Sequence, residues 1–170
     1  MKALPVIRPL LPLLSLLSLT AASAEGRQQP SSQLDFLGGD WTLSGPSGEA
    51  AGTSHIVVQL PGAMIYEERR AEGGQLPVWF VNSESAGGWS QLFPSPSGAL
   101  REFRPSSKPG EWPLVLGTDV RLADGSPARF RLTLTRRSDD ESRRVLEMSG
   151  DSGAHWRPVF DFTYKRVKGR

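Results

Sequence analysis

The chain has 170 residues, with 20 Lys and Arg, 18 Asp and Glu, two His and no Cys. The absence of Cys excludes disulfides, thiol nucleophiles and thiolate metal sites. The first 24 residues contain Lys2 and Arg8 but no acid, so the rest of the chain is formally neutral and gives no electrostatic reason to expect a nucleic acid or an anionic membrane as partner.

The N-terminus predicts a signal peptide. Positive charge at Lys2 and Arg8 precedes an apolar run, Leu10–Leu19, and then Ala22-Ser23-Ala24, which has the small-x-small pattern that signal peptidase requires. A membrane-spanning helix needs roughly twenty apolar residues, about twice the length of this run. We therefore expect cleavage after Ala24, a secreted or periplasmic protein, and no membrane anchor.

Residues 25–33 are polar and lack periodicity, which predicts a flexible lead. One domain is expected over residues 34–168, because a chain of this length can bury a core without disulfides. A short helical turn around residues 31–36 is the one helical segment that the pattern predicts.

From residue 40 onwards, short runs rich in Val, Ile, Phe, Trp and Thr alternate with Gly, Pro, Ser and Asp clusters about every ten residues, which indicates antiparallel strands. The predicted strands cover residues 40–44, 53–60, 63–70, 76–83, 88–93, 99–104, 112–116, 119–122, 128–136, 143–149 and 156–166. About ten meandering strands can form a sandwich or an up-and-down barrel. We favour an all-β, antiparallel up-and-down barrel, because closure removes strand edges and few residues that protect an edge are visible.

Alternation along the strands predicts which side chains face the lumen. The clearest inward sets are Phe130, Leu132 and Leu134; Ile56, Val58 and Leu60; and Trp156, Pro158, Phe160, Phe162 and Tyr164, where only Val159 breaks the pattern. Residues 76–81 are apolar on both faces, so the pattern assigns no inward face there. A barrel of eight to ten strands has an interior just large enough for side chains or one small ligand.

Residues 149–156, SGDSGAHW, match the pattern S-x-D-x-G-x-x-W. This pattern resembles the Asp box of sialidase propellers and several other β folds. The Asp151 carboxylate can accept hydrogen bonds from backbone N–H groups, Gly153 can supply a positive φ, and Trp156 can pack the next strand onto the core. A propeller needs several four-stranded blades, which this chain is too short to supply, so we interpret the box as a structural hairpin.

Residues 34–41, LDFLGGDW, place an apolar turn and a Gly pair before Trp41. This opening resembles the G-x-W motif of lipocalin-like proteins, in which the Trp closes one end of the barrel. With the box hairpin and the closing FDFTYKR of residues 160–166, the chain resembles an uncharacterised secreted family of calycin-like β-barrels. The resemblance covers about residues 34–166 and implies a calycin-type barrel with Trp41 in a structural role. It implies no established activity, and no catalytic residue is carried over.

Charged residues end the predicted strand at residues 63–70. Alternation along Glu67, Glu68, Arg69 and Arg70 sends one acid and one base to each face, so the lumen receives either Glu68 with Arg70 or the other two, unless the strand has already ended. An acid and an Arg inside a barrel could orient a polar ligand or serve general acid–base chemistry. The alternative is a solvated strand end.

His55 and His155 raise the possibility of haem, because distantly related nitrobindin-like barrels hold haem through a single His. His155 lies at a box position that commonly carries a small polar residue, which favours a role in the turn. Two His without a matching carboxylate spacing form no zinc motif. We therefore expect neither a metal nor a cofactor.

The leading hypothesis is a barrel, monomeric or homodimeric, that binds a small, mostly apolar molecule in its lumen without catalysis. Its basis is the barrel pattern, the five Trp residues and the absence of a nucleophile elbow, a P-loop and a dinucleotide motif. The alternatives are a calycin-type isomerase, cyclase or lyase that uses a lumenal Glu/Arg pair, a haem-binding barrel, and an envelope-interaction barrel without a cavity. The predicted ligand-binding residues are Ile56, Val58, Tyr66, Glu68, Trp89, Phe130, Leu132, Phe160, Phe162 and Tyr164, and the predicted structural residues are Trp41, Asp151, Gly153 and Trp156.

Overall fold

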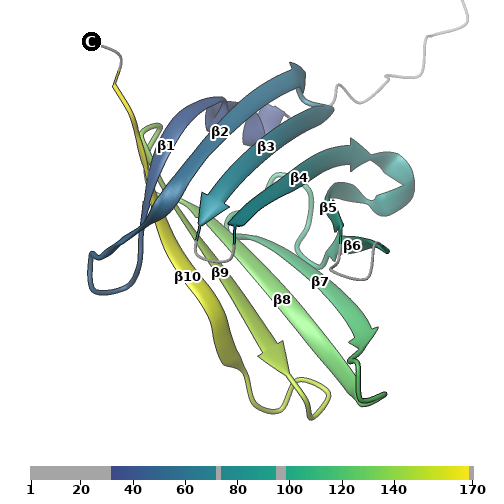
Figure 1. Ribbon diagram of the computed structural model, residues 1–170. Helices are drawn as coiled ribbons and strands as arrows, with labels where there is room; N and C mark the ends of the chain where they lie inside the picture. Colours follow the sequence, from purple (N-terminus) through teal and green to yellow (C-terminus); the bar gives the residue numbers. More distant parts are fainter. Residues whose placement is uncertain (1–31, 72–73, 95–98, 169–170) are drawn as a thin grey trace, which may run out of the picture.

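The computed structural model describes residues 32–71, 74–94 and 99–168. These form a closed antiparallel barrel of ten strands in up-and-down order, in which the last strand pairs with the first (Figure 1). The predicted fold class is confirmed. The predicted signal peptide, its cleavage site, and the lead up to residue 31 lie outside the described residues.

In the described part of the chain, two short 3-10 helices accompany the strands. The elements in chain order are η1 (Ser32–Leu37), β1 (Gly39–Ser44), β2 (Ala50–Leu60), β3 (Met64–Ala71), β4 (Gly74–Ser83), η2 (Glu84–Ala86), β5 (Gly88–Pro94), β6 (Leu100–Pro105), β7 (Leu114–Arg121), β8 (Pro127–Arg136), β9 (Glu141–Ser149) and β10 (Arg157–Arg166). Within the described ranges, no helix has the length and apolar character needed to cross a membrane.

The prediction of two strands at residues 112–116 and 119–122 is wrong, because β7 runs continuously through Gly117. Gly117 pairs with Arg131 of β8 and does not turn the chain. A Gly signals a break only when the backbone needs a conformation that other residues avoid, and this one stays in the ladder.

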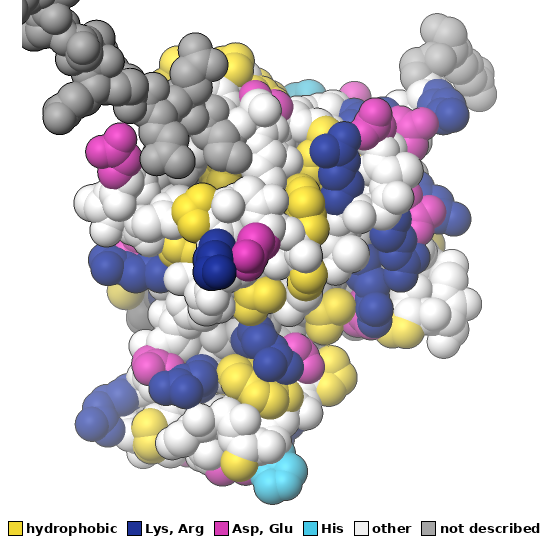
Figure 2. Space-filling model, turned by 180° about the vertical axis from the view of Figure 1, so that it is seen from behind, with side chains coloured by type: hydrophobic (Ala, Val, Ile, Leu, Met, Phe, Trp, Pro, Cys, Tyr) yellow, Lys and Arg dark blue, Asp and Glu magenta, His cyan; other side chains and the backbone are white. Residues whose placement is uncertain are grey.

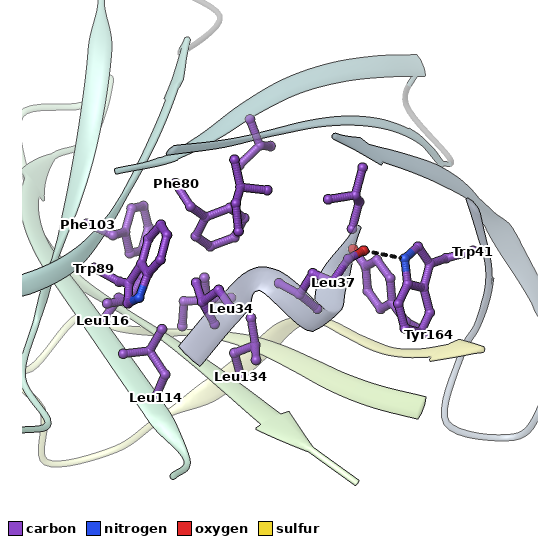
Figure 3. Close-up of a cluster of buried hydrophobic side chains, with 14 of the residues drawn as sticks. Leu34, Leu37, Trp41, Phe80, Trp89, Phe103, Leu114, Leu116, Leu134 and Tyr164 are labelled. Carbon is purple, nitrogen blue, oxygen red and sulfur yellow. Dashed lines mark hydrogen bonds between the residues drawn. The ribbon is translucent and has the colours of Figure 1, made fainter. Parts of the chain in front are cut away.

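One end of the barrel is filled by η1. Its Leu34 and Leu37 are fully buried among the side chains of the strands, and the Trp41 indole Nε1 donates a hydrogen bond to the Leu37 carbonyl at 2.7 Å (Figure 3). The Arg166 guanidinium lies 4.3 Å from the Trp41 ring and donates to the carbonyls of Phe36 and Gly38. Trp41 thus lies buried at the closed end of the barrel, which is called the floor below.

The predicted inward faces of β8 and β2 are largely confirmed. Leu132 and Leu134 are buried, Phe130 packs against the core, and Ile56 is buried near the floor. Leu60 is the exception, with 57% of its surface exposed, because the β2–β3 ladder shifts between Val58 and Leu60. A bulge of this kind exchanges the faces of the residues beyond it.

Two of the predicted lumen residues on β3, Tyr66 and Glu68, face outward, so their assignment is wrong. Tyr66 packs against Trp79 on the outer surface with ring centroids 5.5 Å apart, and Glu68 pairs with Arg70 at 2.8 Å. The buried residues of this strand are Ile65, Glu67 and Arg69. Apolar and charged residues occur on both faces of β3, so alternation alone could not choose between them.

The Asp box forms the hairpin that joins β9 to β10, as predicted. Ser149 Oγ donates to Asp151 Oδ1 at 2.7 Å and accepts from the Gly153 amide at 2.8 Å, while the His155 amide donates to Asp151 Oδ1 at 2.9 Å. The hydrogen bond from the His155 amide, with those from Ser149 and the His155 ring, lowers the pKa of Asp151 well below its ordinary value. Gly153 has the expected positive φ, 100°.

The predicted inward position of Trp156 is wrong. The β9–β10 ladder shifts between Pro158 and Phe160, and Val159, the residue that breaks the alternation, lies at this bulge with 53% of its surface exposed. Trp156 therefore lies on the outer face, where the Arg131 guanidinium covers its ring at 4.2 Å. Beyond the bulge, Phe160, Phe162 and Tyr164 face the interior as predicted.

Candidate ligand-binding site

The barrel is open at the end opposite the floor. A cavity of about 900 Å³ lies there, lined by the β1–β2 turn, the adjoining ends of β3 and β4, and the first half of β10. Figure 1 shows where these strands end. We call this cavity the mouth pocket. The residues of its lining that matter below are Glu49, Arg69, Leu76, Phe160, Asp161 and Phe162.

Two aromatic rings form one wall of the mouth pocket. Phe160 and Phe162 lie two residues apart on β10, so their side chains share a face, and their rings stack with centroids 4.9 Å apart and planes 9° from parallel. Both are only partly buried. The bulge at Val159 matters to this wall, because Trp156 lies on the outer face and unbroken alternation from Trp156 would place Phe160 on the outer face as well.

Arg69 forms the adjoining polar wall. Only 9% of its surface is exposed, yet it lines the cavity. Its guanidinium carbon lies 4.8 Å from the centre of the Phe160 ring, and its charge acts on the nearby Tyr164 hydroxyl in the direction that lowers the pKa of that group. A cation that covers an aromatic face keeps the edge of its guanidinium free for polar partners.

Glu67, Arg144, Ser54 and Tyr164 form a buried polar group, which we call the ion cluster. Ser54 Oγ and the Tyr164 hydroxyl donate to Glu67 Oε1 at 2.8 and 3.2 Å, and Arg144 Nη1 donates to Glu67 Oε2. The Arg144 guanidinium also lies over the rings of Tyr164, at 4.2 Å, and Phe80, at 5.4 Å. All four side chains of the ion cluster are buried.

Burial by itself would raise the pKa of Glu67. The positive charges of Arg144 and Arg69, with the hydrogen bonds from Arg144 and Ser54, outweigh burial and lower it. Burial likewise raises the pKa of Tyr164, and Arg144 offsets this only in part. Glu67 is therefore a carboxylate and Tyr164 a neutral hydroxyl at neutral pH.

The structure separates the ten predicted ligand-binding residues. Phe160 and Phe162 line the mouth pocket, and Tyr164 belongs to the ion cluster. A further five contribute to the apolar interior: Ile56, Val58, Trp89, Phe130 and Leu132. The remaining two, Tyr66 and Glu68, lie outside the barrel.

Arg144 was missed by the sequence analysis. On β9 it alternates with Leu146, which packs against the core, and its neighbour Arg143 faces outward to pair with Asp161 at 2.8 Å. The alternation along β9 could therefore have predicted that the Arg144 side chain faces the interior. Arg69 had been considered, but only as one of two possible inward pairs on β3.

The two His lie far from the lumen. The His155 side chain is 90% exposed in the Asp box, and His55 is exposed on the outer face, where Nδ1 lies 2.6 Å from Asp40. Neither can reach an iron held inside the barrel. Within the described residues, no three His, Cys, Asp or Glu side chains gather in a way that could hold a metal ion.

A second cavity, of about 460 Å³, lies on the outer face beside Trp156. Its cations already have partners: Arg129 pairs with Asp119 at 2.7 Å, and Arg131 with Glu147 at 2.9 Å. The same mixing of basic and acidic side chains is visible on the face shown in Figure 2. Exposed pairs of this kind leave little net charge to recognise a ligand.

Comparison with protein-family models and with curated proteins found no match to this chain. The chemistry of the mouth pocket is therefore the basis for inferring function.

Proposed function

We propose that this protein is a secreted or periplasmic, calycin-like barrel that binds one small, mostly apolar molecule in its mouth pocket. The observation that carries this proposal is the stacked pair Phe160 and Phe162, which is only partly buried and borders a cavity. Its volume, about 900 Å³, is within the range of roughly 300–1,000 Å³ that small-molecule pockets occupy.

Because the floor end of the barrel is filled by side chains, we place the ligand at the mouth and not deep in the lumen. Leu34 and Leu37 of η1 fill the closed end together with side chains of the strands. Along β10, Tyr164 of the ion cluster lies between Arg166 at the floor and Phe162 at the mouth. A ligand in the mouth pocket would therefore keep one side exposed to solvent. Secretion is proposed from residues 1–24 alone, and a monomeric or homodimeric state stays a prediction.

No observation favours the enzymatic or the haem-binding alternative. An isomerase, cyclase or lyase would need a lumenal acid free to exchange a proton, whereas both oxygens of Glu67 accept hydrogen bonds and its pKa is lowered. Haem binding through a single His, the alternative considered above, would need that His inside the barrel, and both His lie on its surface.

The proposal is tested with N-phenyl-1-naphthylamine, an uncharged probe whose fluorescence rises in apolar surroundings. Titration of the purified protein should give saturable binding. Phe162→Ala removes part of the aromatic wall and should weaken binding about tenfold, a loss that corresponds to one well-packed aromatic contact.

The matched control is Tyr66→Ala, which removes an aromatic side chain from the outer face. It should leave the dissociation constant unchanged. No saturable binding to the wild-type protein, or equal losses in the two variants, would refute the assignment of the mouth pocket.

A further inference from the structure

We infer that the molecule held in the mouth pocket is an amphipathic anion: Arg69 binds its single anionic group, a carboxylate or sulfonate, while its apolar part lies against Phe160 and Phe162. This inference rests on the proposed function and names the class of ligand.

The first observation is the incompletely balanced charge of Arg69. Among the described residues, no carboxylate forms an ion pair with its guanidinium, although the side chain is nine-tenths buried. Glu67 pairs with Arg144 and attracts Arg69 only from a longer distance. Its near partners are the neutral Tyr164 hydroxyl and the face of the Phe160 ring. A buried cation whose charge is only partly balanced is costly, so an anion that enters the pocket is attracted to it.

Glu67 balances the charge of Arg69 only in part, because its direct ion pair is with Arg144 and both of its oxygens already accept hydrogen bonds. Oε1 accepts from Ser54 and Tyr164, and Oε2 accepts from Arg144. In Arg144, Nε and Nη2 are buried and have no hydrogen-bond partner, so their N–H donors are unused. The interior around the pocket therefore holds two guanidinium groups and one carboxylate.

The two acids in the lining do not neutralise Arg69 either. Asp161 pairs with Arg143 on the outer face at 2.8 Å. Glu49 is exposed in the β1–β2 turn and accepts from the Ser47 amide at 3.0 Å. Solvent and salt screen a carboxylate at such an exposed position far more than a buried guanidinium.

Geometry joins the charge to the apolar wall. Arg69 lies over Phe160, which stacks on Phe162, so the cation and the exposed rings follow one another along one side of the cavity. A guanidinium edge matches a planar, two-oxygen anion such as a carboxylate. The ligand that fits has its charge at one end and an apolar, preferably flat, body.

The test compares two probes that differ by one group. 1-Anilinonaphthalene-8-sulfonate carries a sulfonate, and N-phenyl-1-naphthylamine is the same skeleton without it. The wild-type protein should bind the sulfonate at least about tenfold more tightly, as expected for one charge-assisted contact in a sheltered site. Arg69→Gln should remove this preference while binding of the uncharged probe persists.

Arg70→Gln is the matched control, since Arg70 is the next residue on β3 but faces outward and pairs with Glu68. It should keep the wild-type preference. Arg69→Lys retains a cation and should keep part of the preference, which decides the matter if Arg69→Gln does not fold, as judged by circular dichroism.

The outcomes separate the two proposals. Equal affinity for both probes in the wild-type protein, or a preference that survives in Arg69→Gln or disappears equally in Arg70→Gln, would overturn the anion inference and leave the apolar pocket standing. Binding of neither probe would overturn both.

Discussion

A carboxylate or a guanidinium buried inside a barrel destabilises the fold unless it is paired with an opposite charge. Glu67 and Arg144 do so through a direct ion pair, and Ser54 and Tyr164 complete the coordination of Glu67. Such pairs often add little net stability compared with apolar residues of similar size, but losing one partner is expensive because the other charge stays buried.

Glu67→Gln should therefore lower the free energy of unfolding by about 3–5 kcal/mol, because it leaves Arg144 charged and buried without a counter-ion. Urea denaturation checks this. The neighbouring Glu68→Gln breaks only the exposed pair with Arg70 and should cost about 0–1 kcal/mol.

A double variant, Glu67→Leu with Arg144→Met, separates charge from packing. Removing both charges should recover part of the loss seen in Glu67→Gln, so the two effects will not add. A double variant at least as unstable as the sum of its single variants would show that the ion cluster contributes chiefly by its shape.

Strand β10 and the hairpin before it show how far sequence alone could lead. The Asp box and the alternation of Phe160, Phe162 and Tyr164 are local signals, and both were recognisable. The bulge at Val159 was visible only as a break in the pattern, and its consequence, the outward turn of Trp156, depends on the pairing with β9.

The same limit applies to β3. Its two faces have matched composition, so only the partner across the lumen, Arg144 on β9, shows why Glu67 lies inside. Closure of the barrel and its floor could be predicted from strand spacing and from the LDFLGGDW motif. The pairing of residues 77 positions apart could not, because no local pattern encodes it.

Gly153 is the residue of the box hairpin whose backbone conformation most requires glycine. Its φ of 100° is strained for any residue with a side chain, and an added Cβ would lie 3.5 Å from the Trp156 ring. Gly153→Ala should destabilise the protein by more than about 1 kcal/mol. Gly150→Ala, in the same hairpin with open space around the added Cβ, should change stability by less than about 0.5 kcal/mol. Equal effects in thermal or urea unfolding would contradict this account of the turn.

The two ends of the barrel have different roles: the floor contributes to stability, and the mouth forms the proposed binding site. The floor is sealed by η1, with Leu37 fully buried and its carbonyl held by Trp41, whereas the mouth exposes part of Phe162 beside an open cavity. Leu37→Ala should lower the free energy of unfolding by about 2–5 kcal/mol, the usual cost of a cavity in a packed core. It should leave the affinity for N-phenyl-1-naphthylamine unchanged, because Leu37 lies at the opposite end from the pocket.

Phe162→Ala should give the reverse result: a smaller loss of stability, since the ring is only partly buried, and a clear loss of probe affinity. Both variants are measured by urea denaturation and by probe titration under one set of conditions. A Leu37→Ala protein that is folded yet binds the probe as weakly as Phe162→Ala would show that the floor and the mouth act as one unit, in which the packing of η1 sets the positions of β3 and β10 around the pocket.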